Sequence, residues 1–328
     1  MKLLIVRFSS IGDVVLTTPV VRCLKQQLPD VTIHYITKKA FLPVLVNNPY
    51  IDRVITIEKS VDEVLEELKS EAYDYVIDLH YNVRTLRLKR ALKTRSFAFP
   101  KENIRKFLLT QFKYNVLPKV HVVDRYFEAV KHLGVTSDGL GCEIVLTEKD
   151  RINLADYQLT EKQFLAVAMG AQFATKQLPV DLLVRCLAPI TQPIVLLGGG
   201  MDSERAAAVV QALPTANIVD LTGKLSLLQS TDITAKASVL LTGDTGLMHL
   251  ASAMNTPIVS VWGNTVPDFG MYPYFPGNQK QFSIHEVPNL SCRPCSKIGY
   301  QSCPKKHFKC MELQDVAAIR KDVIERLN

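Results

Sequence analysis

Short, nearly continuous apolar runs alternate along this chain with longer segments whose apolar residues recur every three or four positions. The runs are rich in valine, isoleucine and leucine, as in LLIV near the start and IVLL after position 193. Such runs are typical of strands that a parallel sheet buries on both faces, and the amphipathic segments are typical of helices that connect one strand to the next. The alternation therefore predicts an α/β fold built from parallel sheets.

The pattern falls into two series, separated by a polar segment at 146–157. The first predicts strands at 2–8, 31–37, 53–57, 73–80 and 95–99, with helices at 14–28, 38–46, 61–70 and 83–92. The second predicts strands at 164–169, 193–198, 217–221, 238–242 and 257–261, with helices at 180–188, 203–213, 226–237 and 246–254. We expect two doubly wound domains, 1–150 and 151–311, followed by a C-terminal helix at 312–328. The cleft between two such domains is the default ligand site.

Composition supports this division and excludes several classes of protein. The chain has 328 residues, 22% of them charged, and a net charge of +7, as in an ordinary globular protein rather than a disordered or fibrous one. No apolar run reaches the roughly 18–20 residues that span a bilayer, and the start has no signal-peptide pattern. We therefore expect a cytoplasmic protein whose seven cysteines are reduced.

Two glycine-containing loops follow strands and open helices. The first is the segment 9–13, which contains Ser10, Gly12 and Asp13. Open α/β sheets bind ligands at the carboxyl ends of their strands, although this loop is neither the G-x-G-x-x-G fingerprint nor a P-loop. Asp13 is equally compatible with a simple helix-capping role.

The second loop carries a run of functional-site candidates, namely Asp244, Thr245, Gly246 and His249. Backbone N–H groups at the start of the helix would favour an anion such as a phosphate. Because a carboxylate would repel that phosphate, Asp244 is expected to meet N–H groups or sugar hydroxyls. The alternative is that Asp244 caps the helix and Gly246 permits close packing.

Two further loops of the second series carry charged candidates. Lys176 precedes the helix at 180–188 and could neutralise a leaving diphosphate, although a solvated surface lysine is the more ordinary interpretation. Asp202 and Glu204 follow the glycines at 198–200 and could accept hydrogen bonds from ribose hydroxyls. They could equally form the acidic first turn of the next helix.

Together these motifs resemble the bacterial heptosyltransferases of lipopolysaccharide core assembly, glycosyltransferase family nine. The resemblance is carried by the segments 4–14, 176–179, 221–224 and 243–251 and by a terminal cysteine cluster. It implies a GT-B architecture, with the acceptor held by the first Rossmann-like domain and the nucleotide sugar by the second. One departure is Arg7, which stands where lysine is usual in the family.

The resemblance also implies roles for individual residues in an inverting transfer of heptose from ADP-heptose to a lipopolysaccharide core acceptor. Asp13 would be the general base, and Lys176 would hold the ADP phosphates. The other donor-site residues would be Asp202 or Glu204 at the ribose, Leu225 at the adenine, and Asp244, Thr245, Gly246 and His249 in the pocket. No D-x-D pair is present, so Lys176 and a helix N-terminus could replace a metal, and no cofactor is expected.

A basic stretch at 84–119 carries eleven lysines and arginines against one glutamate, which suggests a polyanionic partner. In agreement with the family, we favour a phosphorylated glycolipid at the inner membrane surface, with Ser10, Gly12, Arg84 and Arg87 as acceptor contacts. Nucleic acid and a solvated helix face are the alternatives. The interleaved aromatic residues are expected on buried faces rather than on a stacking surface; they are Phe97, Phe99, Phe107 and Phe112.

The cysteine cluster comprises Cys292, Cys295, Cys303 and Cys310. Its C-x-x-C half has the spacing of metal ligands, so a structural zinc site is one alternative. Reduced structural thiols are favoured. Two rival functions also stay open. One is transfer of another nucleotide sugar on the same scaffold, and the other is a non-enzymatic polyanion or nucleic-acid-binding protein that uses the basic stretch.

Overall fold

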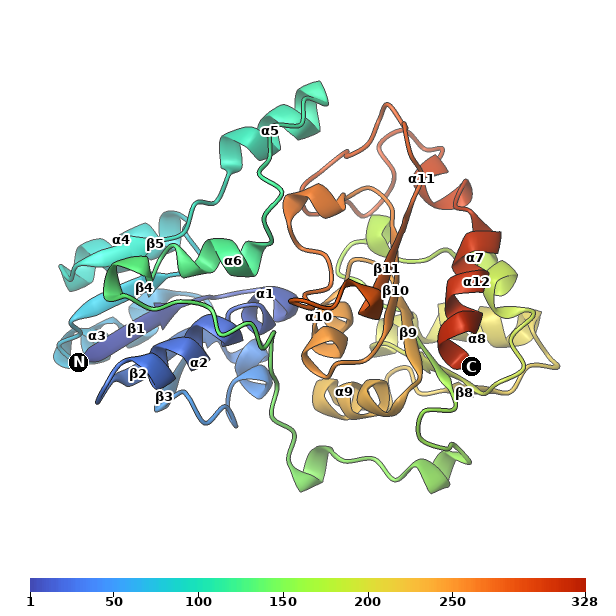
Figure 1. Ribbon diagram of the computed structural model, residues 1–328, viewed down its shortest axis with the longest axis horizontal. Coiled ribbons are helices and arrows are strands. Elements are labelled where there is room, and N and C mark those ends of the chain that lie inside the picture. The colour runs from blue at the N-terminus through green and yellow to red at the C-terminus, as the bar shows by residue number, and fades with distance from the viewer. The chain divides into compact units, whose positions relative to one another are not determined.

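The computed structural model describes residues 1–328, and its contacts divide the chain into two compact units. The first unit contains Met1–Glu102 and Val120–Val145, and the second contains Asn103–Lys119 and Leu146–Asn328. Each unit is built around a parallel β-sheet with helices packed on its faces (Figure 1).

The sheet of the first unit has the strand order β3-β2-β1-β4-β5, and all its neighbours are parallel. Its strands are β1 (Lys2–Val6), β2 (Thr32–Lys38), β3 (Arg53–Ile57), β4 (Tyr75–Asp78) and β5 (Ser96–Ala98). Its helices are α1 (Ile11–Val15), α2 (Thr18–Gln27), α3 (Leu65–Ser70), α4 (Val83–Leu92) and α6 (Val122–Phe127). The central strand β1 places Ile5 beside Tyr35 of β2 and Ile77 of β4.

The second unit has a six-stranded parallel sheet in the order β11-β10-β9-β6-β7-β8. Its strands are β6 (Leu165–Ala168), β7 (Ile194–Leu197), β8 (Ile218–Asp220), β9 (Val239–Thr242), β10 (Ile258–Trp262) and β11 (Phe282–Glu286). Its helices are α5 (Asn103–Phe112), α7 (Val180–Leu187), α8 (Ser203–Ala212), α9 (Leu227–Lys236), α10 (Gly246–Ala253), α11 (Lys309–Glu312) and α12 (Val316–Leu327).

The apolar strand residues explain why helices cover both faces of this second sheet. Leu165 and Val167 of β6 point into a core shared with α7, α8 and α12. Their neighbours Ala166 and Ala168 point into a separate core shared with α9 and α10. Because successive strand residues face opposite sides, a strand without polar positions needs a helical layer on each face.

Strand order reverses once in each sheet, and that point is where open α/β sheets bind ligands. In the first unit the reversal lies between β1 and β4, so the loops after residues 6 and 78 meet there. In the second unit it lies between β6 and β9, so the loops after residues 168 and 242 meet there. Three of these loops carry residues that the sequence analysis selected as candidates.

The structure confirms every predicted strand and adds β11, whose alternating sequence FSIHE was not recognised as a strand. The predicted helix at 14–28 is wrong as a single element, because the chain turns at Thr17 and restarts with Pro19 in the first turn of α2. A 3₁₀ helix with an internal proline replaces the helix predicted at 38–46, and the 61–70 helix begins as 3₁₀ before α3.

Two parts of the chain fall outside the predicted pattern. Helices α5 and α6 lie where no helix was assigned, and the C-terminal helix begins at Val316, after the short α11. The segment Asn103–Lys119 groups with the second unit, because Leu109 packs against Val266 and Phe269. The predicted domain boundaries at 150 and 311 stay a prediction. None of the helices is both long enough and apolar enough to span a membrane.

Candidate functional site

Asp13 and Arg7 form an ion pair at the point where strand order reverses in the first unit. Arg7 directly follows β1, and Asp13 lies in the third position of α1. The Asp13 side chain keeps 18% of its surface exposed, whereas that of Arg7 keeps 8%. The carboxylate is therefore held from the buried side and stays accessible to a ligand.

Asp13 also contributes to the capping of α1, as the capping alternative required. The Ser10 backbone N–H and hydroxyl both donate to Oδ2 of Asp13, at 3.1 and 2.8 Å. Gly12 is buried beneath the same turn. The structure thus brings Ser10, Gly12 and Asp13 together, and the capping bonds fix the direction of a carboxylate that also pairs with a cation.

The guanidinium of Arg7 is bound on every side. Its Nε donates to the Ser9 carbonyl at 2.8 Å, and its Nη1 donates to the Leu79 carbonyl and to the Tyr126 hydroxyl at 3.0 Å. Burial by itself disfavours the cation, but Asp13 and the neighbouring hydroxyls raise the pKa of Arg7 above its ordinary value. Arg7 is therefore a fixed positive charge that links the loop after β1 to the loop after β4.

His80 follows β4 at the same edge of the sheet and was not selected from the sequence. Its Nδ1 is buried without a hydrogen-bond partner, and its ring lies edge-on to Phe8 at 5.3 Å. Burial, with Arg7 and Lys101 nearby, lowers the pKa of His80 to about 4. At neutral pH the ring is uncharged, so it adds an apolar wall with one free nitrogen lone pair or N–H.

The two acceptor-site candidates on α4 lie close to this edge. Arg84 is exposed in the first turn of α4, which begins shortly after β4. Arg87 is also exposed, and its guanidinium pairs with Asp62 at 3.0 Å. Both side chains are exposed to solvent, and a surface pair of the Arg87–Asp62 kind is weak enough to be exchanged for a polyanion.

In the second unit, Lys176 and Asp244 form the corresponding ion pair. Lys176 lies in the loop after β6, Asp244 lies in the loop after β9, and Nζ is 2.7 Å from Oδ2. The two side chains keep 18% and 12% of their surface exposed. The interpretation of Lys176 as a solvated surface lysine is therefore wrong, because its ammonium is drawn to a carboxylate of the neighbouring loop.

Helix α10 begins directly after Asp244. The Thr245 hydroxyl accepts a hydrogen bond from the Met248 N–H at 3.3 Å and lies 3.0 Å from the Thr242 hydroxyl. Gly246 is the first helical residue, and His249 is buried one turn later. Thr245 rather than Asp244 is the N-cap, so the capping alternative for Asp244 is wrong.

Two glycines allow the surrounding loops to approach each other. A Cβ atom on Gly243 would lie 2.3 Å from the Lys176 carbonyl oxygen, and one on Gly263 would lie 2.9 Å from that of Thr175. The Thr265 hydroxyl donates to Asp244 Oδ2 at 2.8 Å. The loops after β6, β9 and β10 thus converge on the Lys176–Asp244 pair, and glycine is required where backbone meets backbone.

Asn264, between these contacts, was also not selected from the sequence. Only 1% of its surface is exposed, and neither its amide nitrogen nor its amide oxygen has a hydrogen-bond partner. A buried amide without partners is costly, so such a group in a native protein calls for an explanation. Asn264 precedes Thr265, which bonds to Asp244, so a ligand bound at the Lys176–Asp244 pair is a candidate to provide those partners.

The ribose and adenine candidates lie on neighbouring loops of the same unit. Asp202 is occupied, because it accepts from the Gly199 N–H at 2.9 Å and lies 3.7 Å from Arg205. Glu204 is exposed in the first turn of α8. Leu225 packs partly buried against the core beneath α9. Of the two acidic candidates, Glu204 is therefore the one with a free carboxylate.

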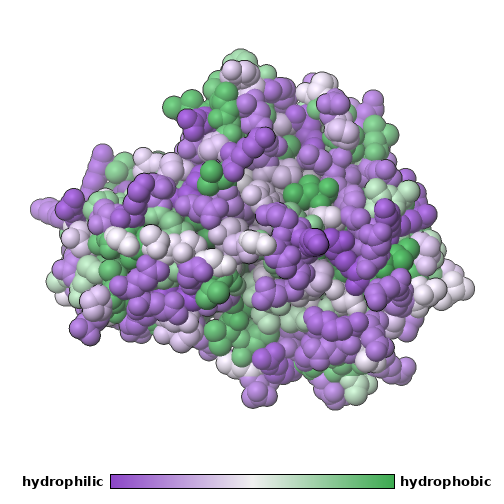
Figure 2. Space-filling view, viewed as in Figure 1, coloured by the Kyte–Doolittle hydropathy of each residue, from purple (hydrophilic) through white to green (hydrophobic).

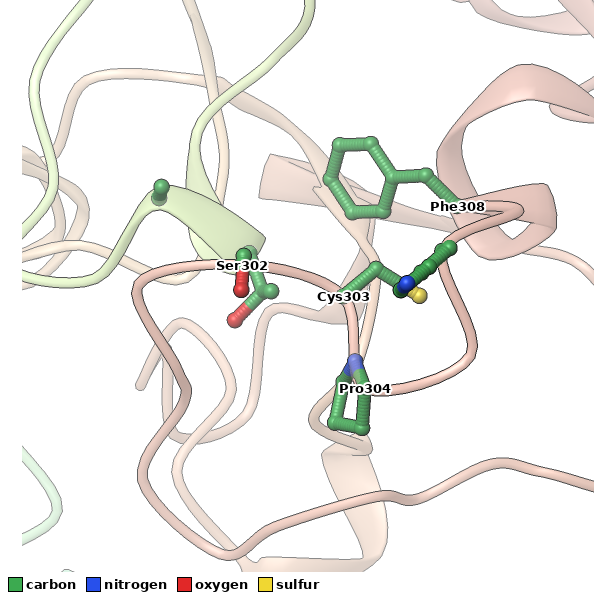
Figure 3. Close-up of a pocket in the computed structure, with 7 residues that line it drawn as sticks. Ser302, Cys303, Pro304 and Phe308 are labelled. Carbon is green, nitrogen blue, oxygen red and sulfur yellow. The ribbon is translucent and has the colours of Figure 1, made fainter.

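A cavity of about 630 Å³ is lined by the turn that carries Thr175 and by the loop 302–308 (Figure 3). None of the predicted donor-site residues lines it. Cys303 is one wall, and Figure 3 shows Ser302, Pro304 and the Phe308 ring around it. This hollow belongs to the cysteine-rich region rather than to the Lys176–Asp244 pair.

In the cysteine cluster, no three His, Cys, Asp or Glu side chains are grouped so that they could hold a metal ion. Cys292 Sγ lies 3.9 Å from His307 Nε2, and the Cys295 thiol donates to the Cys292 carbonyl. Burial raises the pKa of Cys295 to about 11 and that of Cys310 to about 12. Cys295 and Cys310 are therefore neutral thiols at physiological pH.

The chain is similar to known proteins over most of its length. The family model described as glycosyltransferase family 9 (heptosyltransferase) matches residues 61–303. Lipopolysaccharide heptosyltransferase 1 of Campylobacter coli is 26% identical over 293 residues, which cover 81% of this chain and 84% of that protein.

Solved structures of related proteins have the same fold. The glycosyltransferase family 9 protein of Veillonella parvula superposes with a TM-score of 0.79 at 24% identity, covering 99% of this chain and 97% of that one. An Escherichia coli heptosyltransferase bound to ADP-2-deoxy-2-fluoro heptose superposes with a TM-score of 0.68 at 21% identity, covering 99% of each chain. The predicted fold class, two Rossmann-like units of the GT-B type, is confirmed.

Proposed function

Because the chain belongs to glycosyltransferase family 9, the heptosyltransferase family, we propose that it transfers heptose from ADP-heptose to a lipopolysaccharide core acceptor with inversion. The chain is thus a glycosyltransferase, and this membership favours the enzyme over the non-enzymatic polyanion-binding alternative. Support for the donor comes from the related Escherichia coli enzyme, which was solved with an ADP-heptose analogue.

Asp13 acts as the general base in this proposal. The acceptor hydroxyl oxygen forms a bond to the anomeric carbon while the bond from that carbon to the diphosphate breaks, and the hydroxyl proton passes to Asp13. Support comes from the Asp13 carboxylate, because Ser10 and Arg7 fix its orientation. At the same time, 18% of the Asp13 side chain stays exposed. A positioned base of this kind contributes about 10²–10⁴ to the rate.

Lys176 neutralises the leaving ADP. Its ammonium has three N–H donors, so it can bind a phosphate oxygen and keep its bond to Asp244. The N–H groups at the start of α10, beside Thr245 and Gly246, add positive potential for the same diphosphate. These groups supply a positive field without a divalent metal, and the proposal includes no cofactor.

The remaining donor contacts are part of the same proposal, and the positions of their loops support them. Glu204, exposed at the start of α8, accepts from the ribose hydroxyls, while Asp202 supports the loop beneath it. Leu225 contacts the adenine, and the buried His249 of α10 lines the donor site. Asn264, which has no protein partner for its amide, bonds to the bound nucleotide sugar.

The acceptor is a phosphorylated glycolipid, so the proposed place of action is the cytoplasmic side of the inner membrane. Ser10 and Gly12 lie beside Asp13, and the exposed Arg84 and Arg87 bind acceptor phosphates. Support comes from the basic stretch at 84–119, where eleven cations face one glutamate.

The observation that carries the proposal is the presence of one carboxylate–cation pair where strand order reverses in each unit, within a chain of this family. Its test is a donor panel with a purified heptose-deficient core acceptor and no added metal. Transfer from ADP-heptose but not from UDP- or GDP-sugars is the expected result. Efficient transfer from another nucleotide sugar would instead select the rival transferase, and no transfer from any donor would overturn the proposal.

A further inference from the structure

Helix α5 and the segment that follows it, 103–119, expose an unusual number of large apolar side chains. Ile104 is 77% exposed, Phe107 56%, Phe112 68% and Tyr114 63%. Phe107 and Phe112 were expected on buried faces, and that expectation is wrong for both, although Phe99 is buried as predicted. Figure 2 shows hydrophobic side chains gathered at the surface over α5. Surface patches of this kind mark interaction sites.

The exposed apolar face is held in a fixed orientation. On the opposite side of α5, Leu109 is buried against Val266 and Phe269. The Lys113 ammonium donates to the Thr110 carbonyl at 2.6 Å and to the Pro294 carbonyl at 2.7 Å, and the Asn115 amide donates to Asp268 at 2.7 Å. The segment is therefore fastened to its own unit along one side and presents its apolar side outward.

The charged residues of the segment itself are all cations. The segment contains Arg105, Lys106, Lys113 and Lys119 but no aspartate or glutamate. Arg105 and Lys119 are exposed. A helix with outward phenylalanines and flanking cations has the composition of segments that lie in the interfacial layer of a membrane.

We propose that the segment 103–119 docks the protein on the surface of an anionic phospholipid bilayer, with Ile104, Phe107 and Phe112 entering the headgroup region. Arg105 and Lys119 then face lipid phosphates, each strengthening binding by about fivefold at low salt. The proposed place of action at the inner membrane is the setting on which this inference rests, and the segment is the element that would contact the membrane there. Its evidence is the surface itself, and binding to lipid needs neither donor nor acceptor.

Charge separates the bilayer from the other occupants of this face. A second copy joined through the same patch would bring like charges together, since all the charged residues of the segment are cations. Nucleic acid would match the charge and could stack on the two rings, but it offers nothing to Ile104, which is more exposed than either. A bilayer of anionic lipid satisfies both the apolar and the basic side chains.

The test is co-sedimentation of the whole protein with vesicles of phosphatidylcholine alone and of phosphatidylcholine with 30% phosphatidylglycerol, in about 50 mM and 500 mM salt. We expect binding to the anionic vesicles that F107S/F112S weakens at least tenfold. R105E/K119E should weaken it at low salt and matter less at high salt, where charges are screened. Neither readout involves sugar transfer, so failure here leaves the proposed reaction intact.

Matched controls remove comparable groups elsewhere. Leu140 is 71% exposed and Leu313 59%, so L140S/L313S removes similar apolar surface outside the segment. K297E/K305E reverses two exposed cations of the cysteine-rich region. Both controls should bind vesicles like the wild type.

Three results would overturn the proposal. One is no binding to anionic vesicles even at low salt, and another is equal loss in F107S/F112S and its control. The third is a self-association or a duplex-DNA affinity that F107S/F112S abolishes while vesicle binding is unchanged. That result would assign the face to a second copy or to nucleic acid.

Discussion

The two points of strand reversal carry the same chemical pair in different settings. In the first unit the cation is Arg7, whose guanidinium is bound by Asp13, two carbonyls and the Tyr126 hydroxyl. In the second unit the cation is Lys176, whose ammonium has one bonded carboxylate, Asp244. This difference indicates which member of each pair is available to bind a ligand. In the first unit, Arg7 is held in place and Asp13 is the member that can bind a ligand. In the second unit, Asp244 holds Lys176, whose ammonium can bind a ligand.

Removing the two cations should have its largest effect on the stability of the protein. Arg7→Met leaves Asp13 and the Tyr126 hydroxyl without their buried partner, and we expect it to lower the free energy of unfolding by about 3–5 kcal/mol. Lys176→Met removes a cation that has one bonded carboxylate, in a pair about as exposed as the first, and should cost less, about 1–3 kcal/mol. Urea denaturation of both variants measures the two values. Equal losses would show that the two cations have the same structural weight.

Acid should weaken the first unit through His80. Its pKa falls from 6.5 in the unfolded chain to about 4 in the folded protein, because burial and the neighbouring cations disfavour the imidazolium. The unfolded state therefore binds the proton first, so stability is complete above pH 6.5 and declines by up to about 3 kcal/mol toward pH 4.

The check is the pH dependence of urea denaturation in the wild type and in His80→Gln. The variant should lose part of the slope between pH 6.5 and 4, while His34, whose pKa is also lowered, keeps its own share. Identical slopes in the two proteins would contradict the buried neutral imidazole.

The donor site should respond most to Lys176. Lys176→Met removes the ammonium proposed to bind the diphosphate, and we expect ADP affinity to fall by about 10–100-fold, the usual weight of a hydrogen bond to a charged group. Calorimetric titration measures it. The matched control is Lys224→Met, because that lysine lies on a neighbouring loop and donates to the Asp220 carbonyl. Equal losses in both variants would mean a general rather than a local charge effect.

A smaller effect should appear at Asn264. Because its buried amide has no partner in the protein, Asn264→Leu should raise the free energy of unfolding by about 1 kcal/mol and weaken binding of ADP-heptose. Thermal melting and calorimetry together separate the two effects. A destabilised variant with unchanged donor affinity would show that the amide serves the fold.

The sequence predicted the strands well because a parallel sheet buried on both faces requires uninterrupted apolar runs. It predicted β11 poorly, since that edge strand alternates apolar and polar residues and is only partly buried. The helix at 14–28 was taken as continuous because its apolar spacing hides the turn at Thr17. Local pattern thus located the sheets but not every break between helices.

The ion pairs lay beyond sequence reasoning for a different reason. The motifs containing Asp13, Lys176 and Asp244 were visible, but Lys176 and Asp244 are distant in the chain and meet only through the order of β6 and β9. Likewise, the outward direction of Phe107 and Phe112 follows from Leu109 being the residue that packs inward. When a helix has apolar residues on two sides, its sequence pattern does not predict which side is buried.

The most direct test of the account is a paired measurement on Asp13→Asn, of transfer rate and of ADP affinity. Asp138→Asn is the control, because Asp138 belongs to the Arg22 ion pair of the same unit and keeps the same 18% exposure as Asp13. We predict that Asp13→Asn lowers the transfer rate by about 10²–10⁴ with ADP affinity unchanged, while the control retains transfer. Transfer at the wild-type rate, or lost ADP binding in a folded Asp13→Asn protein, would contradict the assignment of the base to the first unit.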